Sequence, residues 1–320
     1  MTILVTGGAG LIGRFVVKEL VEAGHDVVSA DLVPPAALRP RESFERVDIG
    51  DAMTWTRLLT QHRPDAVIHL GAMITHTAHQ APVAACQVNV MGTAYLFEAA
   101  RLLHRPRIVY ASTIMVYGPP SAYQEPIVTE DAPLAPNTIY GATKAMDEAI
   151  AAHYRAVHGI EATGLRPTVT YGPKRYEGAL GSINRGIRDA VLGRPVVWSQ
   201  SFGRDVVHNP IHASDIARAF VRAAVGSYLP SPVYNMGGVE TLSEDDILRI
   251  ILEAAPQHGP LSHGPASPTP VSYMRADFSR FHRDANFAPT LSFHDAVKWA
   301  EQYYTDADFR ASILGAPDTV

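Results

Sequence analysis

The first half of the chain alternates short, apolar, β-branched runs with longer amphipathic segments. Residues 1–6 form a continuous apolar run, as expected for a strand buried on both faces, and residues 12–23 repeat apolar side chains at helical spacing before Gly24. The repetition of this order predicts a parallel sheet with helices on its faces. Right-handed crossovers would make it doubly wound, with the carboxyl ends of its strands along one ligand-binding crevice. Further strands are expected at residues 26–30, 45–49, 66–70, 107–112, 161–166 and 233–236, and further helices at residues 52–61, 83–103, 140–158 and 214–224.

The turn after the first predicted strand is rich in glycine, with TGGAGLIG at residues 6–13. Gly7 can supply a tight turn, Gly10 lets the backbone approach a pyrophosphate, and Gly13 lets the next helix pack closely on the strand. The N-terminus of that helix then faces the anion. Because Asp31 ends the second predicted strand, this turn is interpreted as part of a dinucleotide site rather than as a tight turn alone.

Asp31 is placed to accept hydrogen bonds from the adenosine ribose. A carboxylate there would repel the 2′-phosphate of NADP and accept from the free hydroxyls of NAD, so we expect NAD. Arg39 and Arg41 could accommodate a phosphate, although their Pro-rich loop favours solvated side chains. Asp48 is expected to contact the adenine amino group or, alternatively, to cap the helix that begins near Ala52.

Tyr140 and Lys144 lie four residues apart in the predicted helix 140–158, hence on one face. A free tyrosine has a pKa of about 10, so it becomes a useful base only when its phenolate is stabilised. The Lys144 charge, one turn away, would supply that stabilisation. A hydroxyl at the end of the strand 107–112 would then bind the substrate oxygen; we favour Thr113, with Ser112 as the alternative.

Other motifs follow along the chain: HLGA at residues 69–72, NVMGT at 89–93, ASTIMVYG at 111–118, LRPTVTYGP at 165–173, HASDIARA at 212–219 and YNMGG at 234–238. With the glycine turn, Asp31 and the YGATK segment, they resemble the extended short-chain dehydrogenase/reductase superfamily, in particular its NAD-dependent epimerase/dehydratase branch. The resemblance covers most of the chain. It implies that Thr113, Tyr140 and Lys144 are catalytic. It also implies NAD contacts from Gly7, Gly10, Leu11, Ile12, Gly13, Asp31, Asp48, Ile49, Leu70, Gly71, Ala72, Asn89, Ser112, Tyr140, Lys144, Pro167 and Thr168.

After Gly172 the alternation breaks, and proline and glycine separate shorter segments. We therefore expect an α/β fold with a doubly wound, Rossmann-type NAD-binding domain over residues 1–172 plus about 206–240. A smaller, discontinuous α/β substrate-binding lobe is expected over about residues 173–205 and 241–320. The Pro-rich stretch 256–270 is predicted to be a surface loop.

Two positions depart from the pattern of many sugar-nucleotide enzymes in this family. Their asparagine after LR-x-x is replaced by Val169, and position 208, where they carry an arginine, is His208. A free sugar, a sugar acid or another hydroxy compound is therefore a candidate substrate beside a sugar nucleotide. The residues expected to contact substrate are Met73, His76, Thr113, Val169, Arg175 and Arg204.

Composition narrows the other classes of partner. The formal charge of −5 gives no broad cationic field for nucleic acid, and no apolar run approaches the roughly 20 residues of a membrane span. Met1 leads directly into the first predicted strand, so we expect no export signal and a cytoplasmic location. Cys86 is the single cysteine, which favours a reduced compartment, and it is expected to be a small core residue. The histidine pairs 76/79 and 208/212 lack the further ligands of a metal site, so no metal is expected.

The apolar stripe over residues 88–103, with the helix from Tyr140, resembles the helix pair that forms the dimer contact in this family, although core packing would explain much of the stripe. We expect a homodimer. The first functional hypothesis is an NAD-dependent oxidoreductase or epimerase that transfers hydride between NAD and a secondary alcohol carbon of a sugar or sugar-like substrate. The alternative is a catalytically silent NAD sensor, which would have no chemical need for Thr113, Tyr140 and Lys144 together.

Overall fold

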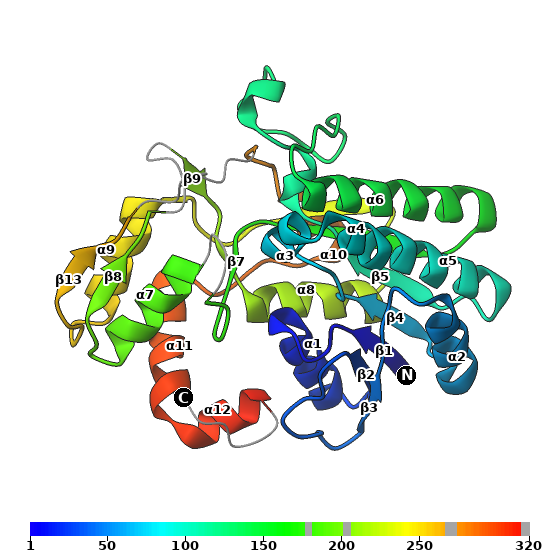
Figure 1. The fold of residues 1–320 in the computed structure, drawn as a ribbon, viewed down its shortest axis with the longest axis horizontal. Coiled ribbons are helices and arrows are strands. Elements are labelled where there is room, and N and C mark those ends of the chain that lie inside the picture. Colours follow the sequence, from blue (N-terminus) through cyan, green and yellow to red (C-terminus); the bar gives the residue numbers. More distant parts are fainter. Residues whose placement is uncertain (177–180, 201–205, 266–273, 315–320) are drawn as a thin grey trace.

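The computed structural model of the protein describes residues 1–176, 181–200, 206–265 and 274–314. Its centre is a seven-stranded parallel sheet of order β11-β6-β5-β4-β1-β2-β3 (Figure 1). The winding direction reverses between β1 and β4, and ligands bind at such a switch point. The strands are β1 (Thr2–Thr6), β2 (Asp26–Asp31), β3 (Glu42–Arg46), β4 (Ala66–His69), β5 (Arg107–Ala111), β6 (Ala162–Pro167) and β11 (Val233–Met236). The predicted doubly wound α/β fold is confirmed.

Helices cover both faces of the sheet: α1 (Leu11–Glu22) and α8 (Ala213–Val225) on one, and α2 (Ala52–His62), α5 (Gly92–Leu102) and α6 (Ile139–His158) on the other. Successive residues of β1 point to opposite faces. Val5 joins the apolar cluster that includes α1 and α8, whereas Leu4 joins the cluster that includes α2, α5 and α6. Each strand is thus fixed from both sides, which explains the continuous apolar runs in the sequence.

Most predicted elements occur within one residue of their expected bounds, but the strand expected at residues 45–49 is wrong. β3 pairs with β2 from Val27 opposite Glu42 to Asp31 opposite Arg46, so the pairing stops where β2 stops. Val47 and Ile49 follow β3 and are buried without being part of a strand. Their apolar character reflects the core rather than the sheet.

The single helix expected at residues 83–103 is divided. α4 (Pro82–Ala85) leads into a π-helical segment, η1 (Cys86–Met91), and α5 follows. The wider turn accompanies an inward Asn89 side chain, which is fully buried. Cys86 lies on the exposed side of the same turn, so its interpretation as a core residue is wrong.

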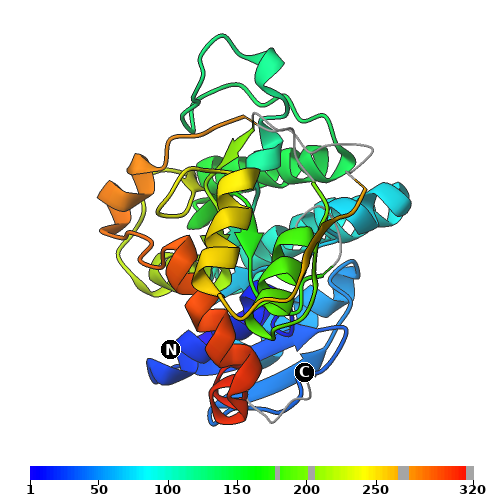
Figure 2. The same ribbon diagram turned by 90° about the vertical axis from the view of Figure 1, so that its left-hand side faces the viewer.

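A smaller group of elements lies beside the sheet: α7 (Gly181–Val191), α9 (Glu244–Ala254) and α11 (Phe293–Thr305) contact one another, and β8 (Val196–Trp198) pairs with β13 (Leu261–His263) (Figure 2). β13 lies in the stretch 256–270, so the prediction of a plain surface loop is wrong there. All three residues of β13 are exposed, and the apolar pattern of a buried strand is therefore missing. The expected domain bounds remain a prediction.

Two short strand pairs connect this group to the sheet: β7 (Thr170–Tyr171) with β10 (Ile211–His212), and β9 (Val207–His208) with β12 (Leu242–Ser243). The remaining short elements are α3 (Thr75–Gln80), η2 (Ile114–Val116), η3 (Pro120–Ala122) and α10 (Ser279–Ala285). None of the described helices combines the length and apolar character needed to cross a bilayer.

The last described helix, α12 (Ala307–Leu314), returns to the N-terminal part of the chain and contacts α1 (Figure 1). The Arg39 guanidinium donates to the carbonyls of Ser312 (2.9 Å) and Ile313 (2.6 Å), near the carboxyl end of α12. A cation at this end of a helix complements its unpaired carbonyls and its dipole. α12 is thereby fixed beside β2 and β3.

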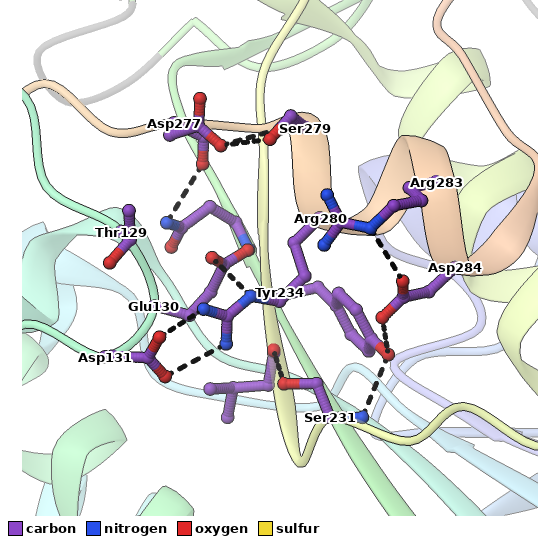
Figure 3. A network of polar contacts seen from close by, with 12 residues as sticks. Thr129, Glu130, Asp131, Ser231, Tyr234, Asp277, Ser279, Arg280, Arg283 and Asp284 are labelled. Carbon is purple, nitrogen blue, oxygen red and sulfur yellow. Dashed lines mark hydrogen bonds and ion pairs between the residues drawn. The ribbon is translucent and has the colours of Figure 1, made fainter.

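A polar network ties the segment before α6 to the C-terminal part of the chain (Figure 3). Arg280 of α10 pairs with Glu130 (3.1 Å from Nε to Oε2), and the Asn235 backbone N–H donates to Glu130 Oε1 (3.0 Å). The hydroxyl of Tyr234 donates to Asp284 Oδ2 (3.1 Å). β11 therefore connects α10 to the chain that leads into α6, and α6 carries the predicted catalytic pair.

Candidate active site

Glycine shapes the turn between β1 and α1. Gly7 has a φ of 69°, in the left-handed region that favours glycine, and its N–H donates to Ala30 O of β2 (2.8 Å). A Cβ atom on Gly13 would lie 2.0 Å from Gly7 O, so α1 can start this close to β1 only with glycine at position 13. The Gly10 N–H donates to Gly7 O (3.0 Å), and α1 then begins at Leu11. The first N–H groups of a helix have no partner within it, so the start of α1 is suited to an anion.

A cavity of about 410 Å³ opens beside this turn. Residues 8–10, Asp31 and the loop at residues 33–37 line it, together with Arg14, Lys174 and Leu314. This volume is within the usual range of small-molecule pockets, about 300–1,000 Å³. A cavity between a helix N-terminus and a carboxylate fits the adenosine half of a dinucleotide.

Asp31 is oriented by backbone N–H groups at the edge of this cavity. Its Oδ2 accepts from Ala9 (3.1 Å) and its Oδ1 accepts from Leu32 (2.7 Å). A carboxylate has about four acceptor positions, so capacity remains for ribose hydroxyls. The two arginines considered for a phosphate already have partners: Arg39 binds the end of α12, and Arg41 pairs with Asp26 (3.1 Å). This arrangement favours NAD over NADP.

The segments after β3 and β4 lie close together. Asp48 Oδ1 accepts from the Gly50 N–H (2.8 Å), and Asp51 rather than Asp48 caps α2, so the capping interpretation of Asp48 is wrong. A Cβ atom on Gly71 would lie 2.9 Å from Ile49 Cδ1, so Ile49 packs directly against Gly71. Leu70 and Ala72 flank Gly71 at the carboxyl end of β4, so these predicted cofactor residues share one part of the crevice.

Asn89 joins three segments at this place. Its Oδ1 accepts from the Met73 N–H (2.8 Å), while its Nδ2 donates to Met73 O (3.0 Å) and to Thr143 Oγ1 of α6 (3.0 Å). Asn89 thus holds the chain after β4 against α6. Pro167 and Thr168 lie at the carboxyl end of β6, where the Thr168 N–H donates to Met236 O (2.9 Å).

Tyr140 lies in the first turn of α6, which begins after Thr138 because the Thr138 Oγ1 accepts from the Gly141 N–H (3.0 Å). A Cβ atom on Gly141 would lie 2.6 Å from Met115 O. Glycine therefore lets α6 approach the turn that follows β5. This close approach brings half-buried Tyr140 to the turn that begins at Thr113.

Thr113 and Ser112 differ in what their hydroxyls bind. Thr113 Oγ1 accepts from the Met115 N–H (3.2 Å), so its own proton remains available to a ligand. The Ser112 hydroxyl donates to Glu148, which also accepts from Arg166 (2.8 Å from Nε and 2.6 Å from Nη2). This geometry favours Thr113 as the hydroxyl that meets a substrate.

Lys144 is almost fully buried, at 1% exposed, and its Nζ lies 2.9 Å from Asp147 Oδ2. Burial alone would lower the pKa of the Lys144 ammonium group, but Asp147, Tyr140 and Glu148 together raise that pKa. Burial, together with the Lys144 charge, lowers the pKa of His69 to about 3, so this imidazole is neutral. Lys144 therefore carries a buried positive charge beside neutral His69.

Arg175 follows β7 and combines burial with an incomplete set of partners. Its Nη1 donates to Thr170 O (3.3 Å), while its buried Nε has no hydrogen-bond partner. Among the described residues, Arg175 pairs with no carboxylate. Burial lowers the pKa of its guanidinium, and the neighbouring Tyr140 hydroxyl partly offsets that effect.

The other predicted substrate residues are scattered. Met73 is half-buried beside Asn89, whereas His76 is exposed on α3. Val169 is buried, and its carbonyl accepts from the Ile211 N–H (2.9 Å). His208 is also buried, which lowers its pKa to about 4, so a neutral group stands at this position. Arg204 lies outside the described residues. In the described part of the chain, no group of three His, Cys, Asp or Glu side chains forms a metal site.

Four residues near the site were not predicted. Asp147 could have been predicted from the sequence, since a residue three positions after Lys144 on the same helix lies within reach of its side chain. Arg14 directly follows the glycine motif. Lys174 and Leu314 reach the cavity only through the tertiary fold, so no local pattern marks them.

Comparison with known proteins places this geometry in a family. The model of the NAD dependent epimerase/dehydratase family matches residues 3–237. A dTDP-glucose 4,6-dehydratase of Xanthomonas campestris is 28% identical, over 98% of this chain and 99% of its own. A UDP-glucose 4-epimerase of Mycolicibacterium smegmatis is 32% identical, over 77% of this chain and 80% of its own. The Thermus thermophilus UDP-glucose 4-epimerase, solved in complex with NAD, is 26% identical with a TM-score of 0.81, over 97% of this chain and 99% of that chain.

The family model covers most of the chain, including the glycine turn, Asp31, Thr113, Tyr140 and Lys144. The predicted family and cofactor are confirmed. The chain belongs to the NAD-dependent epimerase/dehydratase family and is an NAD-dependent enzyme.

Proposed function

We propose that this enzyme transfers hydride between NAD and a secondary alcohol carbon of a sugar or sugar-like substrate. It would either release the oxidised product with NADH or use the bound NADH again in epimerisation. The observation that carries this proposal is that Tyr140 and Lys144 interact electrostatically on α6, and that α6 packs on the turn that follows Thr113 at the carboxyl end of β5. NAD supplies the hydride acceptor. The residues proposed to hold it are Gly7, Gly10–Gly13, Asp31, Asp48, Ile49, Leu70–Ala72, Asn89, Ser112, Tyr140, Lys144, Pro167 and Thr168.

Each of the three side chains has a separate role in this proposal. The Thr113 hydroxyl donates a hydrogen bond to the substrate oxygen and orients it. The Tyr140 hydroxyl oxygen takes the proton of the substrate alcohol during oxidation and returns it during reduction. The buried Lys144 ammonium favours the ionised form of Tyr140, since a charge acts more strongly away from water.

The surroundings of Thr113 favour oxidation or epimerisation over dehydration. Loss of water needs a further acid to protonate the leaving hydroxyl. The two residues after Thr113 are Ile114 and Met115, both buried and apolar. The nearby buried carboxylates have other partners, since Glu148 pairs with Arg166 and Asp147 with Lys144.

Arg175 supports a substrate that carries an anionic group near the reacting carbon. Its buried Nε lacks a partner, and its guanidinium lies close enough to Tyr140 for an electrostatic interaction. A guanidinium binds a carboxylate or a phosphate through paired N–H donors. Neutral His208 and apolar Val169 offer no charge to a diphosphate, so we favour a sugar acid over a sugar nucleotide.

The experiment is incubation of the enzyme with NAD and a panel of UDP-glucose, dTDP-glucose, UDP-glucuronic acid, free hexoses and free sugar acids. Accumulation of NADH identifies a dehydrogenase, and conversion without accumulation identifies an epimerase. Conversion of the nucleotide sugars alone would overturn the preference for a sugar acid. NAD binding without turnover of any compound would instead support the silent sensor.

Tyr140→Phe tests the role of the phenol. Because general acid–base catalysis contributes about 10²- to 10⁴-fold, kcat should fall at least in that range while NAD affinity changes little. Tyr154→Phe is the matched control, since Tyr154 lies on the same helix and donates to Glu98 (2.9 Å), away from Thr113. An unchanged kcat in Tyr140→Phe would overturn the proposed chemistry.

We also propose a homodimer formed by α5 and α6. Large apolar side chains remain exposed on or beside these helices, among them Leu102 (63%), Met146 (51%) and Val157 (62%). Sedimentation of the wild-type protein and of Val157→Lys checks this, with dissociation expected in the variant. A wild-type monomer would contradict it.

A further inference from the structure

The carboxylate of Asp147 is the closest charge to the predicted catalytic ammonium. Asp147 Oδ2 lies 2.9 Å from Lys144 Nζ, and the two residues are 0% and 1% exposed. They are three positions apart on α6 and lie on its inner side. A buried ion pair is weak evidence for stability, since desolvating two charges costs about as much as their attraction gains. The pair therefore needs another explanation.

The next residue on α6, Glu148, is a buried carboxylate with hydrogen bonds to both of its oxygens. Glu148 accepts from the Ser112 hydroxyl and from two nitrogens of Arg166. Asp147 instead has Lys144 on Oδ2, and the Thr93 side chain also lowers the pKa of its carboxyl. Its buried Oδ1 has no partner at full hydrogen-bond geometry among the described residues. Burial accordingly raises the pKa of the Asp147 carboxyl, against the opposing Lys144 charge. Asp147 is thus the less satisfied of two adjacent acids.

The position of Asp147 affects two properties of Lys144. An ammonium group has three N–H donors. Asp147 takes one and so fixes Nζ, leaving two for ligands in the crevice. Asp147, Tyr140 and Glu148 together raise the pKa of the Lys144 ammonium group, so its proton does not depend on Asp147 alone. The negative charge of Asp147 cancels part of the positive potential that reaches Tyr140.

We propose that Asp147 is a positioning residue that fixes the Lys144 ammonium and limits how strongly Lys144 favours the ionised form of Tyr140. This inference rests on the proposed function of Tyr140 and Lys144. The charged or titratable groups around the pair are Tyr140 and Glu148 on α6, His69 on β4, Tyr110 on β5, Arg166 on β6 and Arg175 after β7. Neutral His69 and the paired Glu148 and Arg166 leave Asp147 as the main opposing charge.

The test is the substitution Asp147→Asn in the NAD-loaded enzyme. Ionisation of Tyr140 is followed by tyrosinate absorbance as a difference from the same protein with Tyr140→Phe, which needs no substrate. Removal of the opposing charge should move that ionisation to lower pH by on the order of one unit. The acid limb of the kcat profile should move in the same direction, with KM nearly unchanged. An unchanged or upward-shifted titration would overturn the proposal.

Two further variants separate charge from structure. Asp147→Glu keeps the charge, so the titration should stay at the wild-type position even if kcat falls; a downward shift there would contradict the proposal, and this variant also decides the matter if Asp147→Asn does not fold. Asp215→Asn removes another buried acid, which pairs with Arg218 at the same spacing on α8, and it should leave the Tyr140 titration unchanged. Full activity of Tyr140→Phe would defeat the proposed function itself, whatever the Asp147 variants show.

Discussion

The two ends of the crevice are built in different ways. At the cofactor end, Gly13 can lie against Gly7 because glycine has no side chain, and this sets how closely α1 approaches β1. Backbone N–H groups orient the Asp31 carboxylate. At the proposed substrate end, the long side chain of Arg175 extends from the segment that follows β7. The cofactor end is fixed by backbone sterics and tolerates little change. The substrate end depends on individual side-chain charges, which can change without loss of the fold.

The largest expected effect is that of Gly13→Val, which tests the steric part of this contrast. The new Cβ atom would lie 2.0 Å from Gly7 O, and a backbone carbonyl cannot rotate away as a side chain does. We expect a loss of at least about 3 kcal/mol in the free energy of unfolding. NAD binding, measured by calorimetry, should become undetectable.

Gly24→Ala is the matched control at the other end of α1. Gly24 has a φ of 84°, but a Cβ atom there would meet nothing within 4 Å. The left-handed backbone should cost about 1 kcal/mol, with NAD affinity unchanged. Equal loss of NAD binding in both variants would break the steric argument.

Lowering the pH should reduce the free energy of unfolding, because histidines are buried in the neutral form at both ends of the crevice. Burial lowers the pKa of His69, at the cofactor end, to about 3, and that of His208 and His212, at the substrate end, to about 4. Unfolded histidines bind protons below about pH 6.5, whereas these folded ones do not, so stability is lost as the pH falls from about 6.5 towards 4. Each should cost on the order of 2 kcal/mol at about pH 5.

Denaturant unfolding between about pH 7.5 and pH 5 measures this loss. In His69→Gln, the free energy of unfolding should fall less between these two pH values, by the contribution of one histidine. Hydrogen exchange at the lower pH should show earlier opening at β9 and β10, which carry two of the three histidines. A decrease that is the same with and without His69 would contradict this assignment.

The narrowest expected effect is that of Arg175→Met, which removes one charge from the proposed substrate end and should change KM alone. A hydrogen bond to a charged group contributes about 1.5–3 kcal/mol, so KM for an acidic substrate should rise about 10- to 100-fold. The value of kcat and NAD affinity should change little. The matched control is Arg249→Met, because Arg249 is 56% exposed on α9 and pairs with Glu253. A KM unchanged by Arg175→Met would remove the anionic group from the proposed substrate.

The same contrast explains what the sequence could predict. β1, α1 and the glycine turn follow from local patterns, and the observed bounds agree within one residue. The π-helical turn at Asn89 was missed because its apolar spacing resembles that of an α-helix, and β13 was missed because its residues are exposed. The placement of Tyr140 and Lys144 on one helix could be predicted from their spacing, and their catalytic role stays a prediction.

The substrate end offered no comparable local signal. The unpaired Nε of Arg175 and the burial of His208 arise from contacts between distant segments. An arginine or histidine in a loop looks the same in sequence whether it is solvated or buried. The candidate substrate residues therefore included exposed His76 together with Arg175.

The last described helix has a practical consequence for work on this enzyme. Leu314 of α12 forms part of the wall that Asp31 also lines, and Arg39 joins the end of that helix to the loop after β2. Shortening the chain into α12 would remove Leu314 from that wall while every residue of the glycine turn stays intact, so the residence time of the coenzyme should fall. A change in residence time therefore reports on this distant helix as well as on the nucleotide motif.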